Sequence, residues 1–83
     1  MELTLDAALF GNEKQVHNYL ANALHFPAWY GRNLDALYDC LTDHREDTVI
    51  RLKHWPDHGP LYRITRVMQD AAEENLHLKV IME

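Results

Sequence analysis

The sequence has few of the residues that create special structures: one cysteine, three glycines and three prolines among 83 residues. A single cysteine excludes an intrachain disulfide, so the fold does not depend on an oxidising compartment. No apolar run approaches the roughly 18 residues of a membrane-spanning helix. The opening MELTLDAALFGNEK also lacks the basic start and long apolar core of a secretion signal. We therefore expect a cytoplasmic protein that does not bind membranes.

Basic residues are also scarce, because eight Lys and Arg stand against 13 Asp and Glu, for a net charge of -5. Binding to a nucleic-acid backbone needs a basic stripe, so this balance argues against a nucleic-acid partner and favours a basic protein partner. The hydrophobic share of 47% and the charged share of 25% are typical of one globular domain, here residues 1–83. We expect the chain to be monomeric when free and to need no cofactor.

Three segments have the pattern of β-strands. Met1, Leu3 and Leu5 alternate with polar residues, Thr48–Leu52 is apolar and β-branched, and residues 76–82, LHLKVIM, alternate again. Parallel strands that are covered on both faces are usually continuous apolar runs, whereas the first and last of these segments alternate. The alternation predicts a sheet that is buried on one face only.

Three helices are expected between these strands. Apolar residues recur at helical spacing from about Asn12 to Leu24, and a second helix runs from Leu34 to about Leu41. A third follows Pro60, a residue favoured in the first turn, and ends near Asn75. The order β-α-α-β-α-β with helical crossovers predicts an α/β two-layer fold, a three-stranded parallel sheet with three to four helices packed on one face.

The most informative segment is Phe26–Thr42, FPAWYGRNLDALYDCLT. Pro27 ends the preceding helix, and Gly31 permits a turn that a larger residue would resist. Asn33 is placed to cap the next helix, whose buried side is a stripe of leucines.

The other side of this short helix carries two acids, Asp35 and Asp39, one turn apart. No Lys or Arg follows at a helical spacing that could pair with them, and like charges at this spacing cost roughly 0.2–0.5 kcal/mol. The helix dipole accounts for Asp35 about as well as a binding role does, but Asp39 lies too far along the helix for that explanation. Trp29, Tyr30 and Tyr38 bracket the acids, although aromatic residues most often pack in cores. We interpret the combination as a recognition surface.

This segment is similar to the central signature of the barstar family, intracellular inhibitors of a secreted bacterial ribonuclease. The predicted order of elements and the closing strand LKVIM fit the same family. The matching residues are Pro27, Trp29, Tyr30, Gly31, Asn33, Leu34, Asp35, Ala36, Leu37, Tyr38, Asp39, Cys40 and Leu41.

The resemblance implies that the aromatic loop and the second helix close the active site of a small basic ribonuclease in a one-to-one complex. The acid that matches Asp39 lies where the substrate phosphate binds, and the one that matches Asp35 contacts neighbouring groups. Trp29 and Tyr30 would pack against the rim of that active site, and Gly31 would let the loop approach closely. The implied partner-binding residues are Trp29, Tyr30, Gly31, Asn33, Asp35, Tyr38, Asp39, Asp70 and Glu74.

The chain departs from the family pattern at several places. Arg32 replaces an acid in the binding loop, His44 stands where the family has an aromatic residue, and Trp29 and Tyr38 exchange aromatic types. The stretch Lys53–Pro60 is shorter than in the family, which puts the family's short extra helix in question. These departures concern the identity of the target.

Other functions fit parts of the pattern. A paired-carboxylate enzyme needs a pocket and partner groups that the spacing does not supply, so we expect no catalysis. His54 and His58 are four residues apart, but Pro56 and Gly59 prevent the regular helix that would place both on one metal-binding face. An immunity protein or general interaction module directed at a different basic toxin or nuclease would use the same surface. The sequence leaves that alternative open.

Overall fold

The computed structural model describes residues 1–83 and contains one three-stranded sheet. Its strands are β1 (Glu2–Asp6), β2 (Thr48–Lys53) and β3 (Leu78–Met82), in the order β1-β2-β3, and both pairs are parallel. Leu5 lies opposite Leu52, and Ile50 lies opposite Val80. The apolar positions of neighbouring strands therefore share one face.

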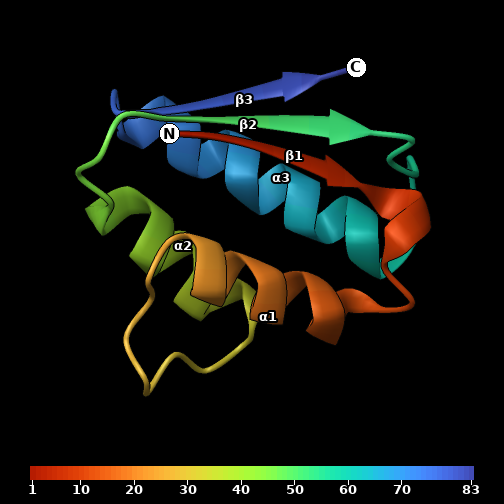
Figure 1. Ribbon diagram of the computed structural model, residues 1–83, viewed down its shortest axis with the longest axis horizontal. Coiled ribbons are helices and arrows are strands. Elements are labelled where there is room, and N and C mark those ends of the chain that lie inside the picture. Colours follow the sequence, from red (N-terminus) through yellow and green to blue (C-terminus); the bar gives the residue numbers. More distant parts are fainter.

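Helices α1 (Glu13–Ala23), α2 (Leu34–Asp43) and α3 (Gly59–Glu74) lie together on that face of the sheet (Figure 1). A short 3-10 turn, η1 (Ala7–Leu9), follows β1, and the stretch between Lys53 and Gly59 forms no helix. The predicted α/β order β-α-α-β-α-β is confirmed. The helices run in the direction opposite to the strands, so their N-terminal ends point toward the carboxyl end of the sheet (Figure 1). None of the helices is long and apolar enough to span a membrane.

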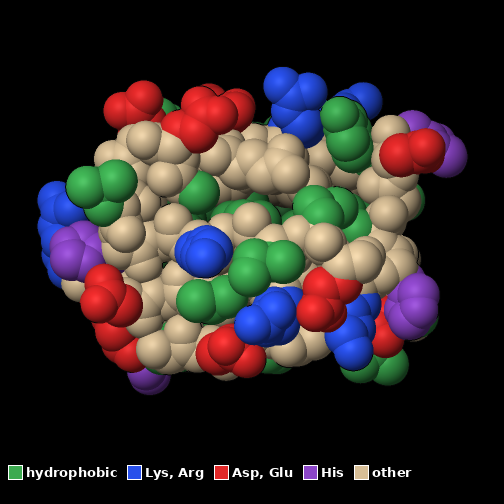
Figure 2. Space-filling view, turned by 90° about the horizontal axis from the view of Figure 1, so that it is seen from above, with side chains coloured by type: hydrophobic (Ala, Val, Ile, Leu, Met, Phe, Trp, Pro, Cys, Tyr) green, Lys and Arg blue, Asp and Glu red, His purple; other side chains and the backbone are tan.

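The opposite face of the sheet has no helix on it and carries charges of both signs among small apolar patches (Figure 2). Arg51 of β2 pairs there with Glu2 at 3.4 Å and with Glu83 at 3.5 Å. Polar residues at outward positions such as Glu2, Thr4 and Lys79 explain why the pattern of the first and last strands alternates. The two-layer arrangement predicted from that alternation is confirmed.

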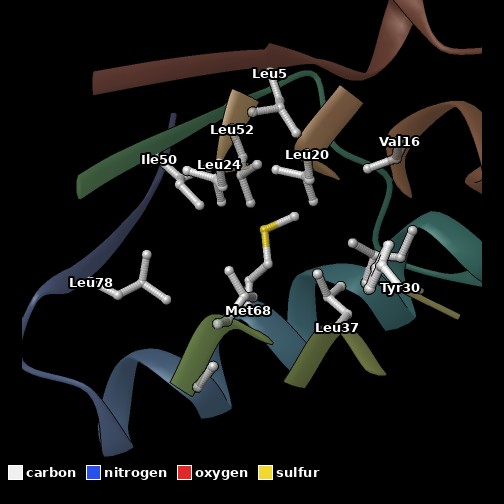
Figure 3. Close-up of a cluster of buried hydrophobic side chains, with 13 residues drawn as sticks. Leu5, Val16, Leu20, Leu24, Tyr30, Leu37, Ile50, Leu52, Met68 and Leu78 are labelled. Carbon is white, nitrogen blue, oxygen red and sulfur yellow. The ribbon is translucent and has the colours of Figure 1, made fainter. Parts of the chain in front are cut away.

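The core fills the space between the sheet and the helices (Figure 3). Leu5, Ile50 and Leu52 project from the sheet and are fully buried, and Met68 of α3 lies between them and Leu37 of α2. The core cluster consists of Leu5, Val16, Leu20, Leu24, Tyr30, Leu37, Leu41, Ile50, Leu52, Ile64, Met68, Ala71 and Leu78.

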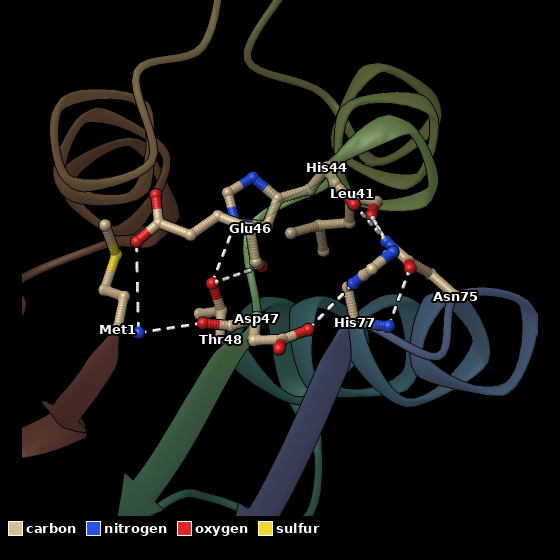
Figure 4. A network of polar contacts seen from close by, with 8 residues as sticks. All are labelled: Met1, Leu41, His44, Glu46, Asp47, Thr48, Asn75 and His77. Atoms are coloured by element: carbon tan, nitrogen blue, oxygen red, sulfur yellow. Dashed lines mark hydrogen bonds and ion pairs between the residues drawn. The ribbon is translucent and has the colours of Figure 1, made fainter.

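Asn75 ties the ends of α2 and α3 together (Figure 4). Its side-chain N–H groups donate to the backbone carbonyls of Leu41, at 2.8 Å, and His44, at 2.7 Å, and its side-chain oxygen accepts from the N–H of His77 at 2.9 Å. The residue is buried, so water does not compete for these bonds. They hold the C-terminal end of α2 against α3 and thereby help to set how α2 is presented to solvent.

The last strand begins later than the sequence predicts. Leu76 is 98% exposed, whereas Leu78 is 4% exposed and is the first residue of β3. Because Asn75 is anchored in the interior, the chain turns outward at Leu76 before it enters the sheet. The prediction that Leu76 shares the buried face of the strand is wrong.

Candidate functional site

Helix α2 forms where the sequence predicts it because its first turn is capped locally. The side-chain oxygen of Asn33 accepts from the N–H of Ala36 at 2.8 Å, and its backbone carbonyl accepts from the N–H of Leu37 at 3.0 Å. Leu37 and Leu41 are completely buried, which orients the helix on the core. The opposite side of α2 is left in solvent.

Three carboxylates lie along that solvent side: Asp35, Asp39 and Asp43, each four residues after the last and all exposed. We call these three residues the acidic row. None of them takes part in an ion pair, since every ion pair of the chain lies elsewhere. Asp43 was not predicted to belong to the site. Its spacing of four residues from Asp39, the same as that between Asp35 and Asp39, indicates that it lies on the same side of the helix. The row places unneutralised negative charge along two turns of helix.

Trp29 lies beside the acidic row in the loop that projects from the helical layer between α1 and α2 (Figure 1). Its side chain is 81% exposed, which no fold-stabilising role explains. It lines a hollow of about 300 Å³ with Asp39, Cys40 and Asp43, and a second hollow of about 310 Å³ on the side of Phe26. The first of these, the Trp29 hollow, combines an aromatic face with two carboxylates.

Tyr30, the neighbour of Trp29, is 3% exposed and belongs to the core. Its hydroxyl lies 2.6 Å from Nδ1 of His17, and its ring packs against Phe26 with a centroid distance of 4.8 Å. Burial raises the pKa of the Tyr30 phenol, so it stays protonated. In the free chain this ring is buried, and its contact with a partner stays a prediction. Tyr30 anchors the loop that exposes Trp29.

The turn before α2 is made by Arg32 rather than by Gly31. Arg32 has a positive φ of 54°, whereas Gly31 does not. A Cβ at Gly31 would lie 3.0 Å from Nδ2 of Asn33, tighter than ordinary contact. Glycine at this position therefore leaves room for the capping amide, and the backbone freedom predicted for it is not used.

The chain is similar to known proteins over nearly its whole length. A family model described as Barstar (barnase inhibitor) matches residues 1–82. The chain belongs to the barstar family. It is also 49% identical over 41 residues to a protein of Bacillus subtilis (strain 168) named "Putative ribonuclease inhibitor YrdF". That match covers 49% of this chain and 45% of the relative, so the chain matches less than half of the relative's length.

The remaining predicted site residues of this barstar-family chain lie on α2 and α3. Tyr38 is half-buried and packs against the core beside the acidic row. Asp70 and Glu74 are exposed on α3, which packs beside α2. The Tyr62 hydroxyl first, and then the carboxylate of Asp70, raise the pKa of Arg66. Asp70 thus has a cation on its own helix, a neighbour that Asp39 lacks.

The thiol of Cys40 lies at the edge of the Trp29 hollow and is partly buried. Burial, followed by the charges of Asp39 and Asp43, raises the pKa of this thiol, which keeps it protonated and poorly nucleophilic. No group of three or more His, Cys, Asp or Glu side chains is arranged to hold a metal ion. The chemistry that the site offers is charge and aromatic surface.

Two histidines near the site make stability depend on pH. Burial lowers the pKa of His17 and of His44 below the usual 6.5. As the pH falls below about 6.5, these histidines become protonated in the unfolded chain but stay neutral in the folded chain. This contribution to stability is complete above that pH and is lost at lower pH, by up to about 1.4 kcal/mol per pH unit for each histidine.

We expect the free energy of unfolding, measured with urea, to fall between about pH 7.5 and about pH 5.5. His17→Gln should remove about half of that slope, because one of the two histidines is gone. An exposed residue without a titratable group supplies a control, and Asn22→Gln should leave the slope unchanged. A wild-type slope that survives in His17→Gln would contradict this assignment.

Proposed function

We propose that this chain inhibits a small basic ribonuclease by inserting the acidic row and the indole of Trp29 into the enzyme's active site. The observation that carries the proposal is a row of three exposed, unpaired carboxylates beside an exposed tryptophan. Membership in the barstar family supports it, as does the ribonuclease inhibitor named among the relatives.

The physical chemistry of a ribonuclease active site suits this surface. A cleft that binds a phosphodiester concentrates Lys, Arg and His side chains in a concave site. Carboxylates on a protruding helix imitate the phosphate, and their field also speeds the encounter with a basic partner. Asp39, in the middle of the row, is the residue we place in the phosphate position, with Asp35 beside it.

The Trp29 hollow suggests how an enzyme side chain would dock. It lies between the indole and the carboxylates of Asp39 and Asp43. A Lys or Arg side chain that entered it would meet both negative charge and an aromatic face, which together favour a cation. Tyr30 supports the loop from below, and Asn33 and Gly31 shape its edge. Asp70 and Glu74 on α3 would extend the contact.

A different basic toxin or nuclease is the alternative target, and the chain would then be an immunity protein. Arg32 favours this reading, because it adds an exposed cation to the loop that precedes the acidic row. It is held there by Asn18, whose side-chain oxygen accepts from its Nε at 2.6 Å. A uniformly basic partner would be repelled at that point.

The test is inhibition of enzyme activity in a titration. Added to a panel of small basic microbial ribonucleases, the chain should abolish RNA cleavage by at least one of them at a one-to-one ratio. Glu2→Ala, which removes a negative charge from the helix-free face of the sheet, should inhibit equally well. Failure against every ribonuclease, together with inhibition of a non-ribonuclease toxin, would establish the alternative.

A further inference from the structure

A pocket of about 240 Å³ lies at the N-terminal ends of all three helices, apart from the acidic row and the Trp29 hollow. We call it the N-terminal pocket. At roughly 30 Å³ per water molecule, it has room for about eight waters. The residues that shape its chemistry are Glu13 and His17 of α1, Arg32 and Asn33 before α2, and Pro60 and Arg63 of α3.

The two arginines of the pocket have no carboxylate partner. Neither Arg32 nor Arg63 takes part in any ion pair of the chain. Arg32 is oriented by two bonds, from Nε to Asn18 at 2.6 Å and from Nη1 to the carbonyl of Tyr30 at 3.2 Å, while Arg63 makes no side-chain hydrogen bond. The guanidinium groups of Arg32, in the loop before α2, and of Arg63, in α3, therefore border one hollow. This local positive charge contrasts with the net charge of -5 of the whole chain.

His17, a buried residue, contributes a donor to the same pocket. The residue is buried, and its Nδ1 is 2.6 Å from the Tyr30 hydroxyl, which has no other hydrogen-bond partner. The phenol must donate to Nδ1, because otherwise its own buried O–H would be unsatisfied, at a cost of about 1–3 kcal/mol. Since burial lowers the pKa of His17 and keeps the ring neutral, the remaining proton sits on Nε2.

The Nε2–H group of His17 has no acceptor within the chain. No fully buried side-chain nitrogen or oxygen of the protein lacks a hydrogen-bond partner, so Nε2 must be reached by solvent. The N-terminal pocket is the solvent space that His17 lines. An otherwise buried side chain thus presents an unpaired donor to this hollow.

The start of α3 lies at the edge of the pocket. His58, at its N-cap, makes no side-chain capping bond, so the first N–H groups of this helix are uncapped at the edge of the pocket near Pro60. Glu13 is the one carboxylate in the lining and opposes an anion there. Two cations and a neutral donor outweigh it.

We propose that the N-terminal pocket binds a phosphate-type oxyanion, held by Arg32, Arg63 and the Nε2–H of His17. A tetrahedral oxyanion has enough acceptor atoms to meet donors from three residues that line one pocket, and arginine is suited to phosphate geometry. The inference does not depend on ribonuclease inhibition, because the pocket and the acidic row use different residues.

The experiment follows the free protein by NMR. Sodium phosphate is titrated into ¹⁵N-labelled protein at about pH 7.5, where His17 is neutral, with sodium chloride adjusted to hold the ionic strength constant. We expect a saturable shift of the Nε2 resonance of His17 and of the Nε resonances of Arg32 and Arg63. A response that does not saturate, or that chloride reproduces, would overturn the proposal.

Three substitutions sharpen the result. Arg63→Gln should weaken phosphate binding by about 3–10-fold, and Glu13→Gln should tighten it by about 2–5-fold, because each changes one charge in the lining. Arg45→Gln, the matched control just beyond the C-terminal end of α2, should leave the affinity unchanged. Equal effects of Arg63→Gln and Arg45→Gln would show that only net charge matters and would refute the site.

The source of the oxyanion is distinguished by a second titration. A nucleoside monophosphate that binds more tightly than inorganic phosphate, with the same dependence on Arg63, identifies the group as part of a nucleotide. Equal affinity identifies a site for free phosphate. Both results support the pocket as an oxyanion site.

Discussion

Asp39→Ala should weaken the complex with the target nuclease by roughly 2–5 kcal/mol or more, while the thermal unfolding of the free chain stays unchanged or shifts slightly upward. The carboxylate has no partner within the chain, so its removal takes no stabilising contact from the fold and relieves repulsion from Asp35 and Asp43. In the complex, its loss leaves the cations of the enzyme buried and unpaired. This range of about 2–5 kcal/mol is the general one for truncating one partner of a buried charge pair. Complexes of this inhibitor family are among the examples behind it.

Binding kinetics separate this effect from general electrostatics. Asp39→Ala should mainly raise the dissociation rate, as expected for a desolvated pair. Glu73→Ala, which removes an exposed acid from α3, should instead slow association, and only at low salt, where the screening length is long. If Asp39→Ala unfolds the chain, or binds as tightly as the wild type, Asp39 is a structural residue and the assigned surface is misplaced.

Leu37→Ala and Leu20→Ala should each lower the free energy of unfolding by about 2–5 kcal/mol, against a total of roughly 4–12 kcal/mol for a domain of this size. Both side chains are completely buried, so the truncation removes apolar contacts and leaves a cavity. Leu37 also orients α2, and its loss should weaken partner binding in proportion to the unfolded fraction. Urea unfolding at neutral pH measures the change.

Leu76→Ala is the matched control for these core substitutions. The same chemical change at an exposed position should alter stability by no more than about 0.5 kcal/mol. It also tests the position of the last strand, because a core-facing Leu76, as the alternating pattern predicted, would cost as much as Leu37. A large loss at Leu76 together with none at Leu37 would reverse the assigned faces.

The local sequence pattern does not predict which aromatic residues of the candidate surface are exposed. Trp29 and Tyr30 are adjacent aromatics in a loop, and nothing in their spacing distinguishes the exposed ring from the buried one. Burial of Tyr30 depends on His17 of α1 and on Phe26 of the loop that follows α1, because both contact the Tyr30 ring. A contact between residues 13 positions apart is a property of the packed chain. The exposure of Trp29 follows from that anchor.

The sequence by itself determined the order of elements, the start of α2 and the solvent side of that helix. These depend on short-range causes: a cap in which Asn33 accepts from an N–H three residues later, and leucines at helical spacing. Because such causes act within one or two turns, they can be read along the chain. The carboxylates of Asp35 and Asp39 were therefore predicted to face outward, and they do.

Only the tertiary structure decided how these elements meet. The bonds from Asn75 to Leu41 and His44 cross 34 and 31 positions of the chain and hold α2 against α3. The same anchoring turns Leu76 outward, against its alternating pattern. The N-terminal pocket likewise exists only because the N-terminal ends of three helices lie around one hollow, which Arg32 and Arg63 both line. Contacts of this kind depend on three-dimensional packing. Their partners lie far apart in the sequence, so the periodicity of the sequence does not reveal them.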